Sequence, residues 1–195
     1  MTAARHAVST RVFHWLTALL VFAALFVGFV MVNSIASYAT LLVVHKTLGV
    51  TILVIVVLRI GNRLFHRGPP LPPTVGALER KVIVMSEFSL YGLLVVQPLV
   101  GWAMLSAAGN RVTIGGVTLP RIAPFSGDLY GLLRQTHTVI AYLLMAVIAA
   151  HVSAVLLHTV TLRDGMLQRM SFRLPLRAAH AQPGSASRDD EPAER

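Results

Sequence analysis

The feature that most constrains this chain is a nearly uninterrupted apolar run from Leu132 to Leu162, which contains His137, His151 and His158. A helix of this length can cross the hydrocarbon core of a bilayer, which needs about 20 residues. On a regular helix, His151 lies about 40° short of four turns from His137, and His158 about 20° short of two turns from His151. The three imidazoles are therefore expected along one stripe, where ionisable side chains are costly and usually mark a functional site.

Composition places the whole chain among membrane proteins. Of its 195 residues, 55% are hydrophobic and only 13% are charged, a balance that differs from that of soluble domains. We expect an all-α fold, an integral membrane four-helix bundle that forms one domain over residues 1–177, with a disordered tail over 178–195. The expected helices cover residues 12–33, 41–64, 80–105 and 131–162.

The formal net charge of +9 has a topological explanation. Basic residues interrupt the hydrophobic spans instead of forming a soluble basic face, so nucleic acid is not an expected partner. If each run crosses the membrane once, most of them fall on one side, which the positive-inside rule assigns to the cytoplasm together with both termini. These residues are Arg5, Arg11, Arg63, Arg67, Arg80, Lys81, Arg163, Arg169, Arg173 and Arg177.

Missing residue types and motifs narrow the chemistry. The chain contains no cysteine, which excludes disulfides, thiolate-held iron–sulfur clusters and the covalent attachment of haem. It also has no H-E-x-x-H, P-loop or G-x-G-x-x-G motif, so hydrolytic, nucleotide-driven and hydride-transfer functions have no support.

Four of the histidines within the expected helices form two pairs, each at one depth in the membrane. Alternating helices bring His45 and His137 to one membrane face, and His14 and His151 toward the other. Low-spin haem iron takes two axial ligands on opposite ring faces, and imidazole is a common ligand. The expected ligand pairs are His45 with His137 and His14 with His151. Their irons would lie about 21 Å apart along the helix axis. Depth alone also permits His14 with His158, whereas the shorter spacing favours His151.

Arg59 lies 14 residues after His45 and therefore shares its helix face. Two interpretations remain open. The side chain can snorkel to the headgroups, or its guanidinium can pair with a haem propionate in a forked geometry. In the third helix, Pro98 is expected to cause a kink, and Gly92 and Gly101 permit close approach of a backbone or cofactor.

The longest connection on the face opposite the termini predicts a small β-hairpin, in which residues 111–119 alternate around a Gly-Gly pair. This face is also basic, with one acidic residue, Asp128. Such a face attracts small anions, and ordinary contact with lipid headgroups explains the charges equally well. The basic residues are Lys46, Arg111, Arg121 and Arg134.

The chain resembles the bacterial cytochrome b561 family of four-helix, di-haem membrane proteins. The resemblance covers nearly the whole chain to about Met170 and rests on the string His14-Trp15, His45 followed by Gly49, Arg59, and the spacing of the three fourth-helix histidines. The closing string from Leu162 to Met170 also resembles the end of that family.

The resemblance implies two non-covalent b haems in a bacterial inner membrane protein, with His14, His45, His137 and His151 as iron ligands. In some members it implies oxidation of superoxide, a small anion, with the electrons passed to ubiquinone. His158 would then take part in quinone binding or proton transfer. Related b subunits instead relay electrons between a hydrogenase or dehydrogenase partner and quinone, and composition does not separate these roles.

A histidine-based proton or metal transporter is the alternative from another class. A proton relay needs acidic partners within the spans, and Glu87 is the residue available for that role.

Overall fold

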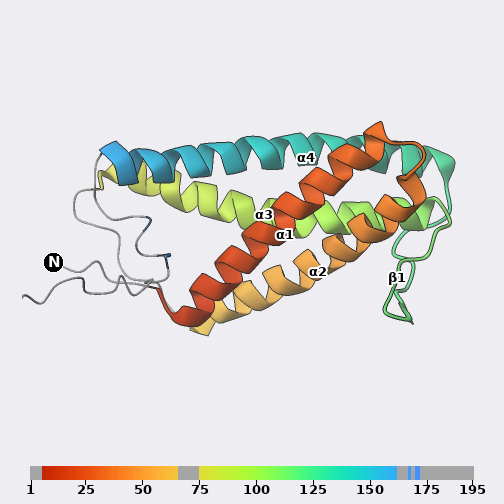
Figure 1. Cartoon of the computed structure of the whole chain (residues 1–195), viewed down its shortest axis with the longest axis horizontal. Helices are drawn as coiled ribbons and strands as arrows, with labels where there is room; N and C mark the ends of the chain where they lie inside the picture. The colour runs from red at the N-terminus through yellow and green to blue at the C-terminus, as the bar shows by residue number, and fades with distance from the viewer. Residues whose placement is uncertain (1–5, 66–74, 162–166, 168–169, 172–195) are drawn as a thin grey trace, which may run out of the picture.

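The computed structural model of this protein describes residues 6–65, 75–161, 167 and 170–171. Within these residues, four long helices follow one another in alternating direction, and each is long and apolar enough to cross a membrane (Figure 1). This confirms the expected all-α four-helix fold. The helices are α1 (Val8–Asn33), α2 (Tyr38–Phe65), α3 (Ala77–Ala107) and α4 (Gly127–Leu156).

The helices pack as two antiparallel pairs. α1 packs on α2 and α3 packs on α4, while α2 and α3 join the two pairs. By contrast, α1 and α4 make few close contacts. Figure 1 shows α1 crossing the bundle obliquely, so that its first turns and the last turns of α2 lie away from α3 and α4. The end of the bundle near these turns is called the terminal end, and the opposite end is called the hairpin end.

A small apolar core holds the pairs together. Its buried members come from all four helices, and many larger apolar side chains point outward, as expected of a surface that faces lipid. On α1, for example, Phe26 and Phe29 are 68% and 69% exposed. The core residues are Val21, Ile52, Val56, Leu94 and Leu144.

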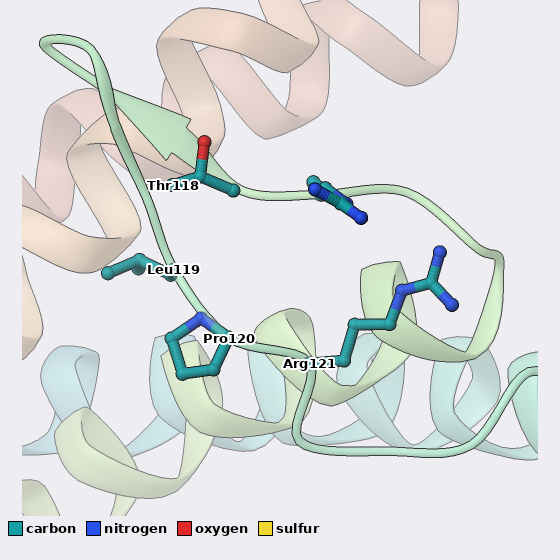
Figure 2. Close-up of a pocket in the computed structure, with 5 residues that line it drawn as sticks. Thr118, Leu119, Pro120 and Arg121 are labelled. Atoms are coloured by element: carbon teal, nitrogen blue, oxygen red, sulfur yellow. The ribbon is translucent and has the colours of Figure 1, made fainter.

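The β-hairpin at the hairpin end agrees with the sequence pattern. Strands β1 (Thr113–Ile114) and β2 (Val117–Thr118) pair antiparallel. The turn requires positive φ at both central residues, which Gly115 and Gly116 supply with φ of 55° and 84°. Beyond β2, the chain forms one side of a pocket against the connection from α3 (Figure 2).

Each helix begins three or four residues before its predicted start. In α4 the hydroxyl of Ser126 accepts a hydrogen bond from the Leu129 amide at 3.3 Å, a side-chain cap. Before α3, the Gly76 amide donates to the Glu79 carboxylate at 3.0 Å. Hydropathy does not detect these caps, so the expected starts at residues 80 and 131 were too late.

The regular part of α4 ends at Leu156, and a π-helical turn, η1 (Leu157–Thr161), follows it. The fourth helical span, predicted to reach residue 162, thus ends in a π turn within the described residues, and residue 162 itself lies outside them. A π turn holds more residues than an α turn and changes the direction of the side chains that follow. The domain boundary expected at residue 177 and the tail over 178–195 lie outside the described residues.

Candidate functional site

Two histidines meet inside the bundle near its hairpin end. His45 on α2 and His137 on α4 have ring centroids 6.2 Å apart, with the ring planes at 81°. Both side chains are partly buried. The structure thus brings together the first of the two pairs expected from depth.

A backbone contact orients the His45 ring. Its Nδ1 lies 3.1 Å from the carbonyl oxygen of Ala24 on α1. A carbonyl only accepts, so this hydrogen bond requires the proton on Nδ1 and leaves Nε2 as the nitrogen free to bind a metal. In metal-binding histidines, the ring nitrogen that does not bind the metal commonly donates a hydrogen bond to a group such as a backbone carbonyl.

A glycine lies directly against each imidazole. A Cβ added to Gly28 on α1 would approach Cε1 of His45 to 3.1 Å, and one added to Gly101 on α3 would approach Cε1 of His137 to 3.0 Å. Gly101 is one of the two glycines expected to allow close approach, whereas a Cβ on the other, Gly92, would meet nothing within 4 Å. Sequence reasoning missed Gly28.

The signal for Gly28 lies in its spacing. It follows His14 by 14 residues, so both lie on one face of α1, at the two depths where histidines occur on other helices.

Polar atoms beside His137 remain without partners. The Gln97 amide donates to the His137 backbone carbonyl at 3.0 Å. The Oε1 atom of Gln97 and the Nδ1 atom of His137 are buried and make no hydrogen bond with the described residues. Buried polar atoms without a hydrogen bond are uncommon in protein cores, and they are expected where a bound group completes a site.

The first pair fits iron in a planar macrocycle. A metal–imidazole bond of about 2 Å, with the ring nitrogen about 1 Å from the ring centre, places two opposing imidazole centroids about 6 Å apart. The observed centroid separation of 6.2 Å agrees with this value. Among the described residues, no three His, Asp or Glu side chains form a metal-binding group. A macrocycle needs only two protein ligands, because it supplies the others itself.

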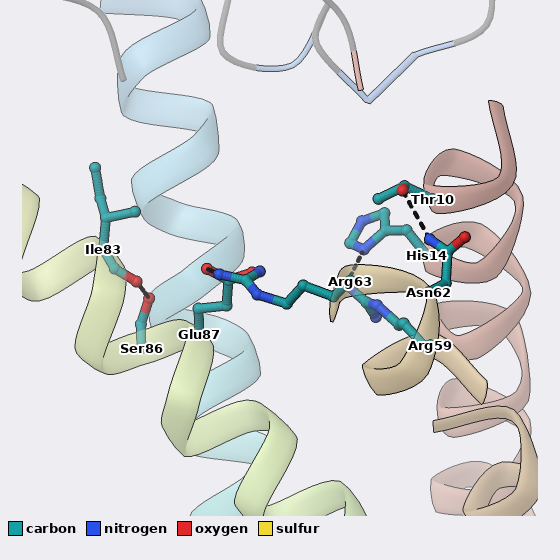
Figure 3. Close-up of polar contacts among 8 residues, drawn as sticks. All are labelled: Thr10, His14, Arg59, Asn62, Arg63, Ile83, Ser86 and Glu87. Atoms are coloured by element: carbon teal, nitrogen blue, oxygen red, sulfur yellow. Dashed lines mark hydrogen bonds and ion pairs between the residues drawn. The ribbon is translucent and has the colours of Figure 1, made fainter. Parts of the chain in front are cut away.

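The second pair lies toward the terminal end, where Arg59 reaches His14. The Nη2 atom of Arg59 on α2 is 3.1 Å from Nδ1 of His14 on α1 (Figure 3). His14, Arg59 and His151 lie close enough to interact electrostatically. The structure therefore places Arg59 in contact with one expected terminal-end ligand, His14.

The charge on Arg59 has no carboxylate partner among the described residues. Its guanidinium lies 5.1 Å from the Tyr91 ring centroid, and that of Arg63 lies 5.7 Å from the same ring. Arg63 binds Glu87 through both carboxylate oxygens, a pairing that Figure 3 shows between α2 and α3. The Nε atom of Arg59 is buried and makes no hydrogen bond with the part of the chain that the structure describes. A cation left in this state attracts an anionic group to the site.

His158 lies within the π turn. It is 8% exposed, which makes it the most buried of the described histidines. At the terminal end, the Trp15 indole donates to the Met170 carbonyl, and Arg11 donates to the Ser171 carbonyl, each at 3.0 Å. Met170 and Ser171 thus contact the first turns of α1.

The sequence is similar to those of known proteins over most of its length. The profile of prokaryotic cytochrome b561 matches residues 5–173. A probable superoxide oxidase, CybB, of Yersinia pestis is 29% identical over 127 residues, which cover 65% of this chain and 72% of that protein. Cytochrome b561 homolog 2 of Escherichia coli (strain K12) is 24% identical over 173 residues, which cover 87% of this chain and 92% of that protein.

The family profile spans all four helices, including both pairs of histidines. The family description implies a b-type haem, a role in electron transfer and a bacterial membrane protein with several spans. The chain belongs to the prokaryotic cytochrome b561 family.

Proposed function

We propose that this protein carries electrons across the bacterial inner membrane through two non-covalent b haems. His45 and His137 would hold one haem near the hairpin end. The observation that carries this proposal is their centroid separation of 6.2 Å, which suits two ligands on opposite faces of one iron. The hydrogen bond from His45 to Ala24 and the glycines beside both rings support the same assignment.

His14 and His151 would hold the second haem near the terminal end. These ligands come from α1 and α4, which make few close contacts with each other. Arg59, which has no carboxylate partner among the described residues, would bind a propionate. Because His137 and His151 are 14 residues apart, the irons would lie about 21 Å apart along α4. When bound, the haems would supply reversible one-electron transfer between the two membrane faces.

We propose superoxide as the electron donor and ubiquinone as the acceptor. Two superoxide anions would each lose one electron and leave as dioxygen, and ubiquinone would take up the two electrons with two protons. The relative named a probable superoxide oxidase supports this choice. The positive-inside rule would place both termini in the cytoplasm and the basic hairpin end outside. Positive potential at that end would attract a small anion.

His158 is the proposed quinone-side residue. Its imidazole is buried, and it follows His151 by seven residues along the chain. It also lies in a π turn, a feature often found at functional sites. An imidazole can exchange a proton near neutral pH. We infer that it binds the quinone oxygen or delivers one of its protons.

A proton relay has less support from the described residues. Glu87, the acidic residue that such a relay would use, is bound on both carboxylate oxygens by Arg63. A relay through Glu87 would first have to break this ion pair.

The test is superoxide-dependent reduction of ubiquinone by the purified protein in detergent or vesicles. We expect quinol to form with a yield of about one per two superoxide anions, the ratio that the electron balance of the reaction sets. Haem-loaded protein that is inactive, and that copurifies with a dehydrogenase or hydrogenase, would instead identify a subunit that relays electrons to quinone.

A further inference from the structure

A pocket lies at the base of the β-hairpin, and no histidine is among its lining residues. Its volume is about 470 Å³. The lining consists of Arg111, Thr118, Leu119, Pro120 and Arg121. Figure 2 shows the Arg121 side chain lying along one side of this space, opposite Thr118. Two guanidinium groups therefore share a single pocket.

Hydrogen bonds hold the walls of the pocket in place. The Leu119 amide donates to the Val112 carbonyl at 2.9 Å, and Val112 is 2% exposed. The Trp102 indole on α3 donates to the Pro120 carbonyl at 3.1 Å. Arg121 donates to the Gly109 carbonyl at 3.2 Å. The lining is thus attached to the end of α3, and its geometry is set before any ligand arrives.

The two positive charges of the pocket are not neutralised within the described residues. Arg111 makes no hydrogen bond or ion pair there, and Arg121 binds only a neutral carbonyl oxygen. The ion pair of Arg63 and Glu87 lies near the terminal end, outside the pocket. Two guanidinium groups that face one space repel each other unless an anion lies between them, and their forked donors match a phosphate group.

The position and size of the pocket favour a lipid headgroup. Trp102, which anchors the pocket, lies in the last turns of a membrane-spanning helix, where tryptophan marks the depth of the headgroups. A volume of about 470 Å³ lies within the range of small-molecule sites, about 300–1,000 Å³. It exceeds the space that a bare phosphate needs and leaves room for the glycerol of a phospholipid headgroup.

We propose that Arg111 and Arg121 bind a phosphate-class oxyanion, presented by the headgroup of an anionic phospholipid. This site shares no residue with the proposed haem ligands. Arg111 and Arg121 also belong to the basic hairpin end that would attract superoxide, so a bound lipid would lower the positive potential there. Basic pockets at the ends of membrane helices recognise phosphate headgroups by the same chemistry. The bound lipid would join the hairpin to the end of α3 and neutralise the charge of the pocket.

The test compares the wild-type protein with the Arg111→Gln/Arg121→Gln double variant. Both are purified in a neutral detergent, stripped of lipid, and incubated with phosphatidylglycerol, with phosphatidylcholine or with inorganic phosphate. Native mass spectrometry counts bound lipid, and thermal unfolding reports stabilisation by each additive. Arg134→Gln is the matched control, since it removes one positive charge from the same end of the bundle but lies outside the pocket.

We expect the wild type and Arg134→Gln to retain phosphatidylglycerol in preference to phosphatidylcholine. The double variant should bind it at least about tenfold more weakly, because charge-assisted hydrogen bonds are lost. Stabilisation by inorganic phosphate alone, absent in the double variant, would identify a free ion as the source of the oxyanion. Equal lipid retention and equal stabilisation of all three proteins would overturn the proposal. Both arginines are exposed, and circular dichroism checks that the double variant is folded.

Discussion

The imidazole rings of His45 on α2 and His137 on α4 lie 6.2 Å apart between centroids, on helices that are far apart in sequence. A glycine lies against each ring: Gly28 of α1 against His45, and Gly101 of α3 against His137. The spacing is wide enough for one metal ion between two ring nitrogens.

Replacement of His137 by alanine should remove one haem. One axial ligand would be lost at the hairpin end, while the ligands of the terminal-end haem would remain. We expect the haem content to fall from about two per chain to about one, measured as pyridine haemochrome per protein. Thr138→Ala is the control, because the Thr138 hydroxyl bonds only the Arg134 carbonyl of its own helix. Unchanged haem content in His137→Ala would refute the pairing.

Gly101→Ala should disturb the same haem without touching a ligand. The new methyl group would lie 3.0 Å from Cε1 of His137, so the ring must move. We expect a shifted reduced absorption band or partial loss of one haem. In Gly92→Ala, on the same helix, the added methyl group meets nothing within 4 Å, and the spectrum should match the wild type. Identical spectra for both variants would mean that His137 is not held at the iron.

Arg59→Gln should lower the midpoint potential of one haem. The positive charge beside His14 favours the reduced iron, which carries one positive charge fewer. Its removal is expected to shift the potential downward on the order of tens of millivolts, as followed by a redox titration of the absorption bands.

The control for Arg59 is the double variant Arg63→Gln/Glu87→Gln. It removes a bound ion pair from the same cluster with no change of net charge. Its effect on both potentials should be much smaller. A shift of equal size in Arg59→Gln and the double variant would argue against a charge effect of Arg59.

His158→Gln should separate haem binding from quinone chemistry. The imidazole lies in η1, outside both ligand pairs, so haem content and spectrum should stay unchanged. Ubiquinone reduction should fall by about 10²-fold or more, the usual effect of losing a proton-transferring group. Thr159→Ala, from the same π turn, should retain activity, since its hydroxyl bonds only the Val155 carbonyl. Full activity of His158→Gln would remove this residue from the quinone site.

The spans and the grouping of the histidines follow from sequence because they depend on periodic, local properties. Long apolar runs have one stable form in lipid, a helix. Alternating helices then determine the depth of each histidine. The Gly-Gly hairpin was equally accessible, since Gly115 and Gly116 have the positive φ values that the turn requires.

The remaining features depend on contacts between distant residues. The position of Arg59 against His14 and Tyr91 involves three helices, and the helical face of Arg59 alone suggested a location on the side of His45. The π turn at Leu157 has no glycine or proline within it, so no local signal marks the change in helix type. The bond from His45 to Ala24 uses a backbone carbonyl, which side-chain patterns do not reveal.

The most direct test of the two-haem assignment is the haem content of the purified wild-type chain, with oxidised and dithionite-reduced absorbance spectra. We predict about two non-covalent haem b groups per chain, both extractable by acidic organic solvent, and a reducible b-type band. A folded, monodisperse protein that contains a single haem, or shows no reducible band, would contradict the assignment of His14, His45, His137 and His151 as two pairs of iron ligands.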